Sequence, residues 1–349
     1  MKKTIVGCFR SEDWRRQVCC VLALALLVAV TLYGRATLAN TPRSVRLEVY
    51  AFSTQEEVMT QALFPAFEAA WEAETGRDLS IEGVFGPSGT LAGQINLGAP
   101  ADVAVFSHSQ DVTHLRVGRR VRAATEPLLL GYTPMVIVTR PGNPLGLASF
   151  ADLAQPGLNL LHADPRGSGA GQWAVLAEYG SALDQGAEQA EAQLQAVWRN
   201  VRVLAPSARA AMTLFELGAG DALVTYEQDA RLARARGVAL EIVVPERTIV
   251  AQPVAVVVDE NVTAAERPVA EAFVRYLVSD AGQQILREYY LRTASGGDEV
   301  FPGLPQAFTV EDLGGWPKAY NSLVESLWLG EIEPRLDLLS SPQILDRGE

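Results

Sequence analysis

The chain has 349 residues and a formal net charge of −12, because 41 acidic residues outnumber 29 Lys and Arg. An acidic protein of this kind repels polyanions, which argues against nucleic acid or an anionic membrane surface as a partner. The 3 cysteines are Cys8, Cys19 and Cys20. A chain that loses this N-terminal segment therefore has no disulfide, no thiolate metal site and no cysteine nucleophile.

The first 39 residues are typical of a secretory signal peptide. A basic segment is followed by an apolar run at 18–33 and then by small residues, which is the order of regions in such signals. The run is shorter than the roughly 20 residues that a membrane-spanning helix needs, so we expect export and cleavage after Ala39. Cleavage removes six basic and two acidic residues and changes the net charge from −12 to −16. About 310 residues then remain, which is enough for two domains.

The part after the signal peptide begins with alternating strand and helix patterns. Apolar and β-branched runs predict strands at 44–52, 79–85 and 101–107, and helical spacing predicts helices at 54–74 and 91–97. This βαβαβ order is typical of a mostly parallel sheet between two layers of helices.

A second α/β unit follows with the same alternation. The sequence predicts strands at 131–140, 158–163, 201–205 and 221–226, and helices at 150–153, within 164–180 and at 208–217. A strand at 253–259 and one long helix at 264–290 then return to the first pattern. We therefore expect an α/β protein of two three-layer lobes, 40–128 plus 252–349 and 129–251, joined by two crossings near 126–131 and 247–253.

The loop DPRGSGAGQW, which begins at Asp164, has the composition of an anion cradle. Small residues let the backbone approach a ligand closely, and a helix N-terminus offers unpaired N–H groups and a favourable dipole. A Walker loop would end in Gly-Lys-Ser/Thr, whereas Gln172 and Trp173 stand here. Lys318 is the one lysine after residue 39. Nucleotide binding is therefore not favoured.

Several separated stretches together resemble the periplasmic sulfate/thiosulfate-binding proteins of ABC importers. They are LEVYAFST, AWEAETG, FGPSGTLAGQINLGAPADV, RPGNPLGLASFADLAQPGLNL, DPRGSGAGQW, NVRVLAPSARAAMTLFELGAGDALVTYEQDA and FTVEDLGGWPKAY. The resemblance covers nearly all of the chain after the signal peptide. It implies the type II periplasmic binding fold, in which two α/β lobes joined by two hinge strands close over the ligand. It also implies a monomer that captures sulfate or thiosulfate in the periplasm and delivers it to a permease with ATPase subunits, without a cofactor, metal or catalytic residue.

The same resemblance assigns ligand binding to seven positions. Ser88 and Ser168 would donate hydroxyl groups, main-chain N–H groups would come from Gly169, Ala170 and Ala208, and Phe52 and Tyr226 would complete the site. Three of these positions depart from the family pattern: Phe52 replaces Asp, Tyr226 replaces Trp and Ala170 replaces Gly. An indole only donates a hydrogen bond, whereas a phenol donates or accepts. Tyr226 therefore introduces a group that tolerates a protonated oxyanion.

The residues leave other functions open. Molybdate, phosphate or ferric ion are alternative ligands, and ferric ion would require the paired Tyr289 and Tyr290 to face the cleft. A sensor subunit would bind a ligand without an importer. A hydrolase is disfavoured because the string GPSGT lacks the first glycine of a Gly-x-Ser-x-Gly elbow. The spacing of His108, His114 and His162 matches no common metal motif.

Overall fold

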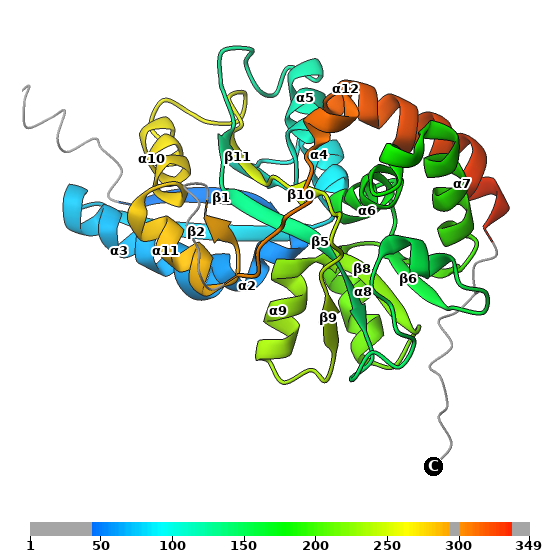
Figure 1. The fold of residues 1–349 in the computed structure, drawn as a ribbon. Helices are drawn as coiled ribbons and strands as arrows, with labels where there is room; N and C mark the ends of the chain where they lie inside the picture. The colour runs from blue at the N-terminus through cyan, green and yellow to red at the C-terminus, as the bar shows by residue number, and fades with distance from the viewer. Residues whose placement is uncertain (1–43, 294–300, 337–349) are drawn as a thin grey trace, which may run out of the picture. The chain divides into compact units, whose positions relative to one another are not determined.

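Two β-sheets organise the part of the chain that the computed structural model describes, residues 44–293 and 301–336. The predicted signal peptide, residues 1–39, lies outside these ranges. Figure 1 shows the strands of both sheets with helices packed around them. Within the same ranges, every helix is too short or too polar to cross a bilayer.

The first sheet has the strand order β2-β1-β3-β11-β4. Its strands are β1 (Ser44–Phe52), β2 (Asp78–Gly86), β3 (Val103–Phe106), β4 (Leu128–Leu129) and β11 (Val254–Val257). β1 runs parallel to β3, and Val49 lies opposite Val103. β11 returns from much later in the chain and lies antiparallel to β3 and β4. The predicted strands at 44–52, 79–85, 101–107 and 253–259 are therefore confirmed as members of one sheet.

The second sheet has the order β10-β5-β8-β6-β7, and β9 and β12 also pair with β5. Its strands are β5 (Gly131–Thr139), β6 (Leu160–Ala163), β7 (Val201–Ala205), β8 (Ala222–Tyr226), β9 (Glu241–Val243), β10 (Val250–Ala251) and β12 (Arg292–Thr293). β6 is parallel to β7 and β8, whereas β5 is antiparallel to β8, β9, β10 and β12. Both sheets are mixed, although the sequence pattern predicts mostly parallel pairing.

The helices that follow strand ends are mostly short. They are α4 (Ser88–Asn96), α5 (Ser109–Val117), α6 (Gly169–Gly180), α8 (Ala208–Glu216) and α9 (Glu227–Ala235), and α7 (Ala187–Trp198) follows α6. α6 is buried along its whole length, and its polar Gln172 and Glu178 have hydrogen-bond partners in the interior. α5, α7 and α9 are absent from the predicted elements.

The helix predicted at 54–74 is one continuous helical stretch whose hydrogen-bonding pattern changes along its length. It comprises η1 (Ser53–Gln55), α2 (Glu56–Val58), the π-helical turn η2 (Met59–Leu63) and α3 (Phe64–Thr75). Gly76 ends it in the left-handed conformation, with φ of 65°, which a residue without Cβ adopts at no steric cost.

The long helix predicted at 264–290 is wrong, because the chain forms two helices there. These are α10 (Arg267–Leu277) and α11 (Asp280–Glu288). The Ser279 hydroxyl accepts a hydrogen bond from the N–H of Gly282 at 3.3 Å. A serine in this position satisfies a free N–H group and starts a new helix, so a local cap interrupts the apolar periodicity.

The C-terminal segment contacts residues beside α5, which follows a strand of the first sheet, and residues of α6, which follows a strand of the second. It comprises η5 (Val310–Leu313), α12 (Trp316–Ala319), the π-helix η6 (Tyr320–Ile332) and η7 (Glu333–Arg335). The Trp316 ring packs on His108 beside α5, with ring centroids 4.2 Å apart, and meets Trp173 of α6 edge to face at 4.6 Å. The predicted assignment of 252–349 to one lobe does not anticipate these contacts or the entry of β12 into the second sheet.

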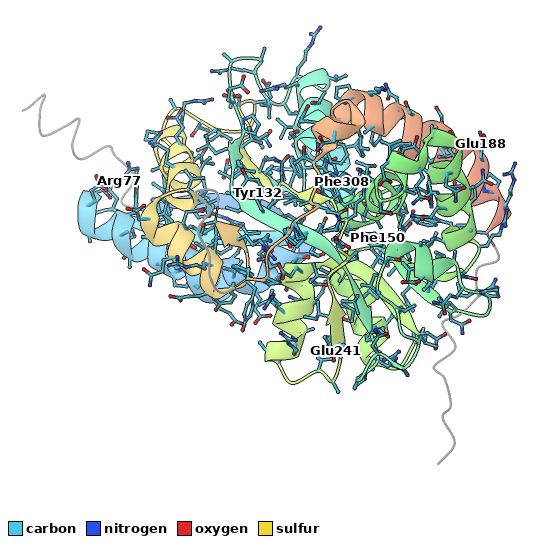
Figure 2. All side chains as sticks on the ribbon, in the orientation of Figure 1. Arg77, Tyr132, Phe150, Glu188, Glu241 and Phe308 are labelled. Carbon is cyan, nitrogen blue, oxygen red and sulfur yellow. The ribbon has the colours of Figure 1, made fainter. Side chains whose placement is uncertain are left out.

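Aromatic side chains also fill the interior beneath these helices. Phe150 is fully buried and Phe308 is 6% exposed, and both are labelled near the middle of the molecule in Figure 2. Glu188 and Glu241 are exposed and are labelled at the margin of the molecule in the same figure. Phe308 also forms a bridge with Ile249, which ties the C-terminal segment to the second sheet.

Candidate functional site

Three helices begin at one small pocket. α4 starts at Ser88, α6 at Gly169 and α8 at Ala208, where about 170 Å³ of space, partly open to solvent, separates the lining atoms. The lining residues are Phe52, Ser53, Gly86, Pro87, Ser88, Ser107, Ser168, Gly169, Ala170, Ala208 and Tyr226. The structure therefore brings together all seven residues that the resemblance assigns to a ligand. Strands β1, β2, β3 and β8 end there, which is the usual place of a ligand in α/β sheets.

Ser168 precedes α6 and has a hydroxyl group that its helix does not use. Its backbone is extended, with φ of −104° and ψ of 123°, and its side chain makes no capping hydrogen bond. Only 2% of the residue is exposed. Because a serine before a helix ordinarily caps it, the free hydroxyl favours a role toward the pocket over a purely local one.

The first turn of α6 presents main-chain donors to the same pocket. The N–H groups of Gly169 and Ala170 lie in the first turn, where a helix has no internal acceptors for them. The N–H of Thr90 in α4 donates to the carbonyl of Gly167 at 3.1 Å. This bond holds the starts of α4 and α6 against each other.

Ser88 differs from the expectation that its hydroxyl donates to a ligand. The Ser88 hydroxyl donates to Oδ2 of Asp111 at 2.6 Å and accepts a hydrogen bond from the N–H of Ser107 at 3.1 Å. A serine has one hydroxyl proton, and here that proton is directed to the carboxylate. What Ser88 offers to the pocket in this structure is its main-chain N–H at the start of α4.

Two neighbouring residues at the start of α8 have different roles, one as a helix cap and one as part of the pocket lining. The Ser207 hydroxyl caps the helix by accepting the N–H of Ala210 at 3.2 Å. Ala208 is the first helical residue and is 3% exposed. The N–H of Ala208 lies in the first turn, where a helix has no internal acceptor for it, and Ala208 lines the pocket.

Phe52 and Tyr226 form the aromatic side of the pocket. Their rings meet edge to face, with centroids 6.0 Å apart. Tyr226 is 1% exposed, and burial raises the pKa of its hydroxyl well above the ordinary value. The phenol therefore stays protonated and offers a neutral donor.

No Asp, Glu, His, Lys or Arg lines the pocket among the described residues, although one aspartate and two histidines lie behind it. Asp111 is 1% exposed, and its carboxylate oxygens lie 3.7 Å from His108 Nε2 and from His114 Nδ1. Burial opposes ionisation of Asp111, but His108 and the hydrogen bonds of His114 and Ser88 lower its pKa. Burial also lowers the pKa of His108, against the opposing effect of Asp111. The pocket thus offers neutral donors, and the Asp111 carboxylate lies behind them.

The described residues contain no cluster of His, Cys, Asp and Glu that could hold a metal ion. Tyr289 and Tyr290 are absent from the pocket lining, so the arrangement that ferric ion would require is not present there. His162 Nε2 lies 2.6 Å from Glu178 Oε1, and both side chains are fully buried. These residues belong to the interior of the second sheet rather than to the site.

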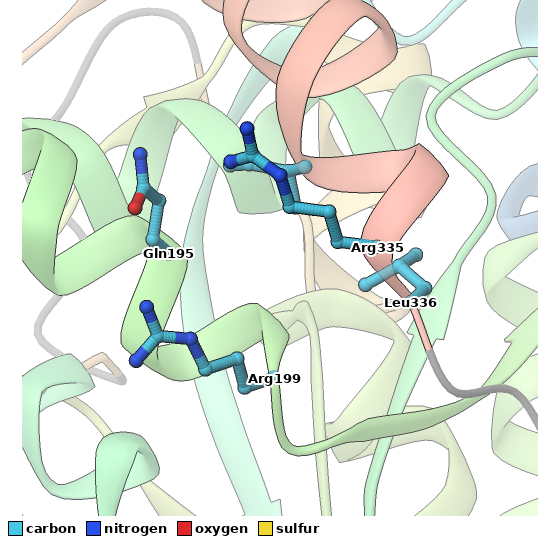
Figure 3. A pocket seen from close by; sticks show the side chains of 5 residues that line it. Gln195, Arg199, Arg335 and Leu336 are labelled. Atoms are coloured by element: carbon cyan, nitrogen blue, oxygen red, sulfur yellow. The ribbon is translucent and has the colours of Figure 1, made fainter.

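A second pocket lies elsewhere, between α7 and the C-terminal segment (Figure 3). It has about 290 Å³ of space and is lined by Gln195, Arg199, Ile332, Arg335 and Leu336. Both arginines are exposed, so solvent screens their charge. The smaller pocket is the better candidate, because its donors are buried, oriented by helices and contributed by several elements.

Two serines in the pocket lining are absent from the predicted site. Ser53 follows β1 and Ser107 follows β3. The available signal was their position, because a polar residue directly after a buried strand faces the ligand edge of an α/β sheet.

Comparisons with known proteins agree with this geometry. The family of bacterial extracellular solute-binding proteins matches residues 47–292. The sulfate-binding protein of Escherichia coli (strain K12) is 35% identical over 272 residues, which are 73% of this chain and 82% of that protein. The thiosulfate-binding protein of the same organism is 31% identical over 318 residues, or 85% and 91% of the two chains.

The fold is likewise found in solved structures. The sulfate-binding protein SubI from Mycobacterium tuberculosis H37Rv superposes with a TM-score of 0.74 and 24% identity, covering 80% of this chain and 99% of that one. The predicted type II periplasmic binding fold and the predicted family resemblance are both confirmed. The relatives are solute-binding proteins and not enzymes. The chain therefore belongs to the bacterial extracellular solute-binding proteins.

Proposed function

We propose that this protein captures sulfate or thiosulfate in the periplasm and delivers it to the permease and ATPase subunits of an ABC importer. The observation that carries the proposal is the meeting of three helix N-termini and the free Ser168 hydroxyl at a pocket without a charged lining residue. The names of the relatives point to the same ligands.

Neutral donors are suited to a tetrahedral dianion. Such an ion accepts hydrogen bonds at every oxygen, and each hydrogen bond to a charged group contributes roughly 1.5–3 kcal/mol. About six or seven oriented donors therefore offset the loss of hydration without a lysine or arginine. The dipoles of α4, α6 and α8 add favourable potential, because each helix directs its positive end to the pocket.

Phosphate and molybdate are the alternative ligands. The phenol of Tyr226 can accept as well as donate a hydrogen bond, and this favours phosphate, which carries a proton at neutral pH, over molybdate, which does not. Ferric ion fits less well because neither Tyr289 nor Tyr290 lines the pocket.

Closure over the ligand is the signal that we propose for the permease. The two sheets would form the cores of two lobes, 40–128 plus 252–349 and 129–251, in a monomer released by cleavage after Ala39. Gln55 Nε2 donates to Gln228 Oε1 at 2.8 Å, a contact between the predicted lobes. A ligand that binds both lobes stabilises the closed state by its differential affinity.

Calorimetric titration of the purified, anion-free protein with sulfate, thiosulfate, molybdate and phosphate tests the proposal. We expect tight binding of sulfate or thiosulfate and none of phosphate. Tight binding of phosphate or molybdate alone would contradict the ligand assignment. Failure to bind any of the four would contradict the oxyanion function itself.

A further inference from the structure

Ser107 is a buried serine whose main chain is fully engaged and whose hydroxyl is not. It is 1% exposed. Its N–H donates to Ser88 Oγ at 3.1 Å, and its carbonyl accepts a hydrogen bond from Trp173 Nε1 at 3.1 Å. Its own Oγ has no hydrogen-bond partner among the residues that the structure describes. A buried hydroxyl without a partner costs about 1–3 kcal/mol, so such a group calls for an explanation.

The Ser107 side chain lies against the first residue of α6. A Cβ atom at Gly169 would overlap with Ser107 Oγ. Because Gly169 has no side chain, the Ser107 hydroxyl has room to lie beside the start of α6. Ser107 also lines the same pocket as Ser168.

Tyr226 provides a second buried hydroxyl beside Ser107. The Tyr226 hydroxyl also lacks a partner of good geometry among the described residues. The two hydroxyls are close enough for Ser107 to act on the pKa of Tyr226. Their interaction lowers the pKa of Tyr226 against the larger rise that burial causes, and both residues line the pocket.

We infer that Ser107 is a ligand-binding residue, and that its hydroxyl and that of Tyr226 donate to one oxygen of the bound anion. This inference rests on the proposed function and deepens it. One deprotonated oxygen has enough lone pairs to accept both protons. Ser107 thereby supplies the side-chain donor that Ser88 does not, since the Ser88 proton is directed to Asp111.

Calorimetry with sulfate tests this role through Ser107→Ala, with Ser109→Ala as the matched control. Ser109 is two residues away on α5 and does not line the pocket. We expect Ser107→Ala to weaken sulfate binding about tenfold, as for the loss of one hydrogen bond to a charged group. The control should bind within twofold of the wild type. Binding by Ser107→Ala within twofold of the wild type would overturn the inference and leave the proposed function standing.

A thermal melt without ligand separates a binding role from a structural one. Ser107→Ala removes an unpaired hydroxyl, so its melting temperature should equal or exceed that of the wild type, while the rise caused by sulfate should shrink. A melting temperature that falls without ligand would show a structural role and overturn the inference. If the wild type binds neither sulfate nor thiosulfate, the proposed function fails and the ligand role of Ser107 fails with it.

The double variant Ser107→Ala/Tyr226→Phe tests whether the two hydroxyls share an oxygen. Groups that bind one atom are coupled, so the combined loss of affinity should differ from the product of the single losses by at least about threefold. Independent effects would overturn the shared oxygen.

Discussion

At the residue scale, Ser168 and Ser207 show how similar serines serve different purposes. Both precede a helix that starts at the pocket. Ser207 caps its helix through the N–H of Ala210, whereas Ser168 makes no capping bond. The uncapped start of α6 forgoes roughly 1 kcal/mol of helix stabilisation, which a hydrogen bond to an anion more than restores.

Ser168→Ala is expected to weaken sulfate binding by about 1–3 kcal/mol, because a charged oxygen loses a donor. The fold should keep its stability, since the hydroxyl caps nothing. Calorimetry on the variant checks the first point and chemical denaturation the second. Ser326→Ala, at an exposed position of η6, serves as the control and should match the wild type in both. Equal affinity of Ser168→Ala and wild type would remove the loop from the site.

Asp102 provides a pH-dependent test of stability away from the pocket. Burial raises its pKa to about 6, although the N–H of Glu48 donates to Oδ2 at 2.8 Å. Between about pH 4 and the folded-state value, the folded chain binds more protons than the unfolded chain, so the free energy of unfolding falls as pH rises. Asp102→Asn keeps an acceptor for Glu48 and carries no charge.

We therefore expect Asp102→Asn to be more stable than the wild type at pH 8, by about 1 kcal/mol after allowance for solvent screening. The difference should shrink as pH falls and vanish well below pH 4, where the wild-type carboxyl is protonated in both states. Urea unfolding at the two pH values measures it. A variant that is less stable than the wild type at pH 8 would mean that the charged form of Asp102 is favoured.

At the scale of elements, the site is made of helix starts. α4, α6 and α8 each begin with a small residue, namely Ser88, Gly169 and Ala208. Small side chains bring the first-turn N–H groups close to a ligand, and the helix dipoles favour a negative charge there. The position of each helix start matters more than the length of the helix, because the favourable potential falls off within the first turn.

Gly169→Ala is expected to abolish or strongly weaken anion binding, because the new Cβ would overlap with Ser107 Oγ and approach His108 Nε2 to 3.2 Å. Gly93→Ala on α4 is the matched control, since a Cβ there meets no atom within 4 Å. The control should bind normally and gain up to about 1 kcal/mol of stability from the higher helix propensity of alanine. If both variants bind sulfate equally well, the first residue of α6 does not lie at the ligand.

Local sequence patterns predicted the strands of four or more residues because each has an apolar or alternating run of its own, but they missed the shorter strands β4, β9, β10 and β12. β7 matches its predicted range of 201–205, and β1 matches 44–52. The break between α10 and α11 was missed because the Ser279 cap is compatible with the apolar spacing on both sides. The mixed pairing was also missed, since β5 and β11 owe their directions to long-range crossings that local periodicity does not encode.

The candidate site, too, was predicted only in part from the sequence. The resemblance assigned seven residues, and the structure brings them to one pocket. The direction of the Ser88 proton was not predictable, because Asp111 lies 23 positions further along the chain. Ser107 was missed because its importance depends on the approach of α6 to the end of β3, which only tertiary packing establishes.

At the scale of the whole molecule, the pocket draws its lining from strand and helix ends of both sheets. Phe52 and Ser88 come from the side of the first sheet, and Ser168, Ala208 and Tyr226 from the side of the second. One small anion contacted from both sides would couple the two sheets. The C-terminal segment adds another link through Trp316, which contacts both His108 and Trp173. The proposed function and the role of Ser107 both depend on where the anion binds.

A crystal structure with selenate, a tetrahedral dianion whose selenium gives an anomalous signal, tests that location most directly. We expect one strong selenium peak among the first turns of α4, α6 and α8, within hydrogen-bond distance of Ser168 Oγ and of the N–H groups of Gly169 and Ala170. A peak beside Arg199 and Arg335, with none among the three helix starts, would contradict it.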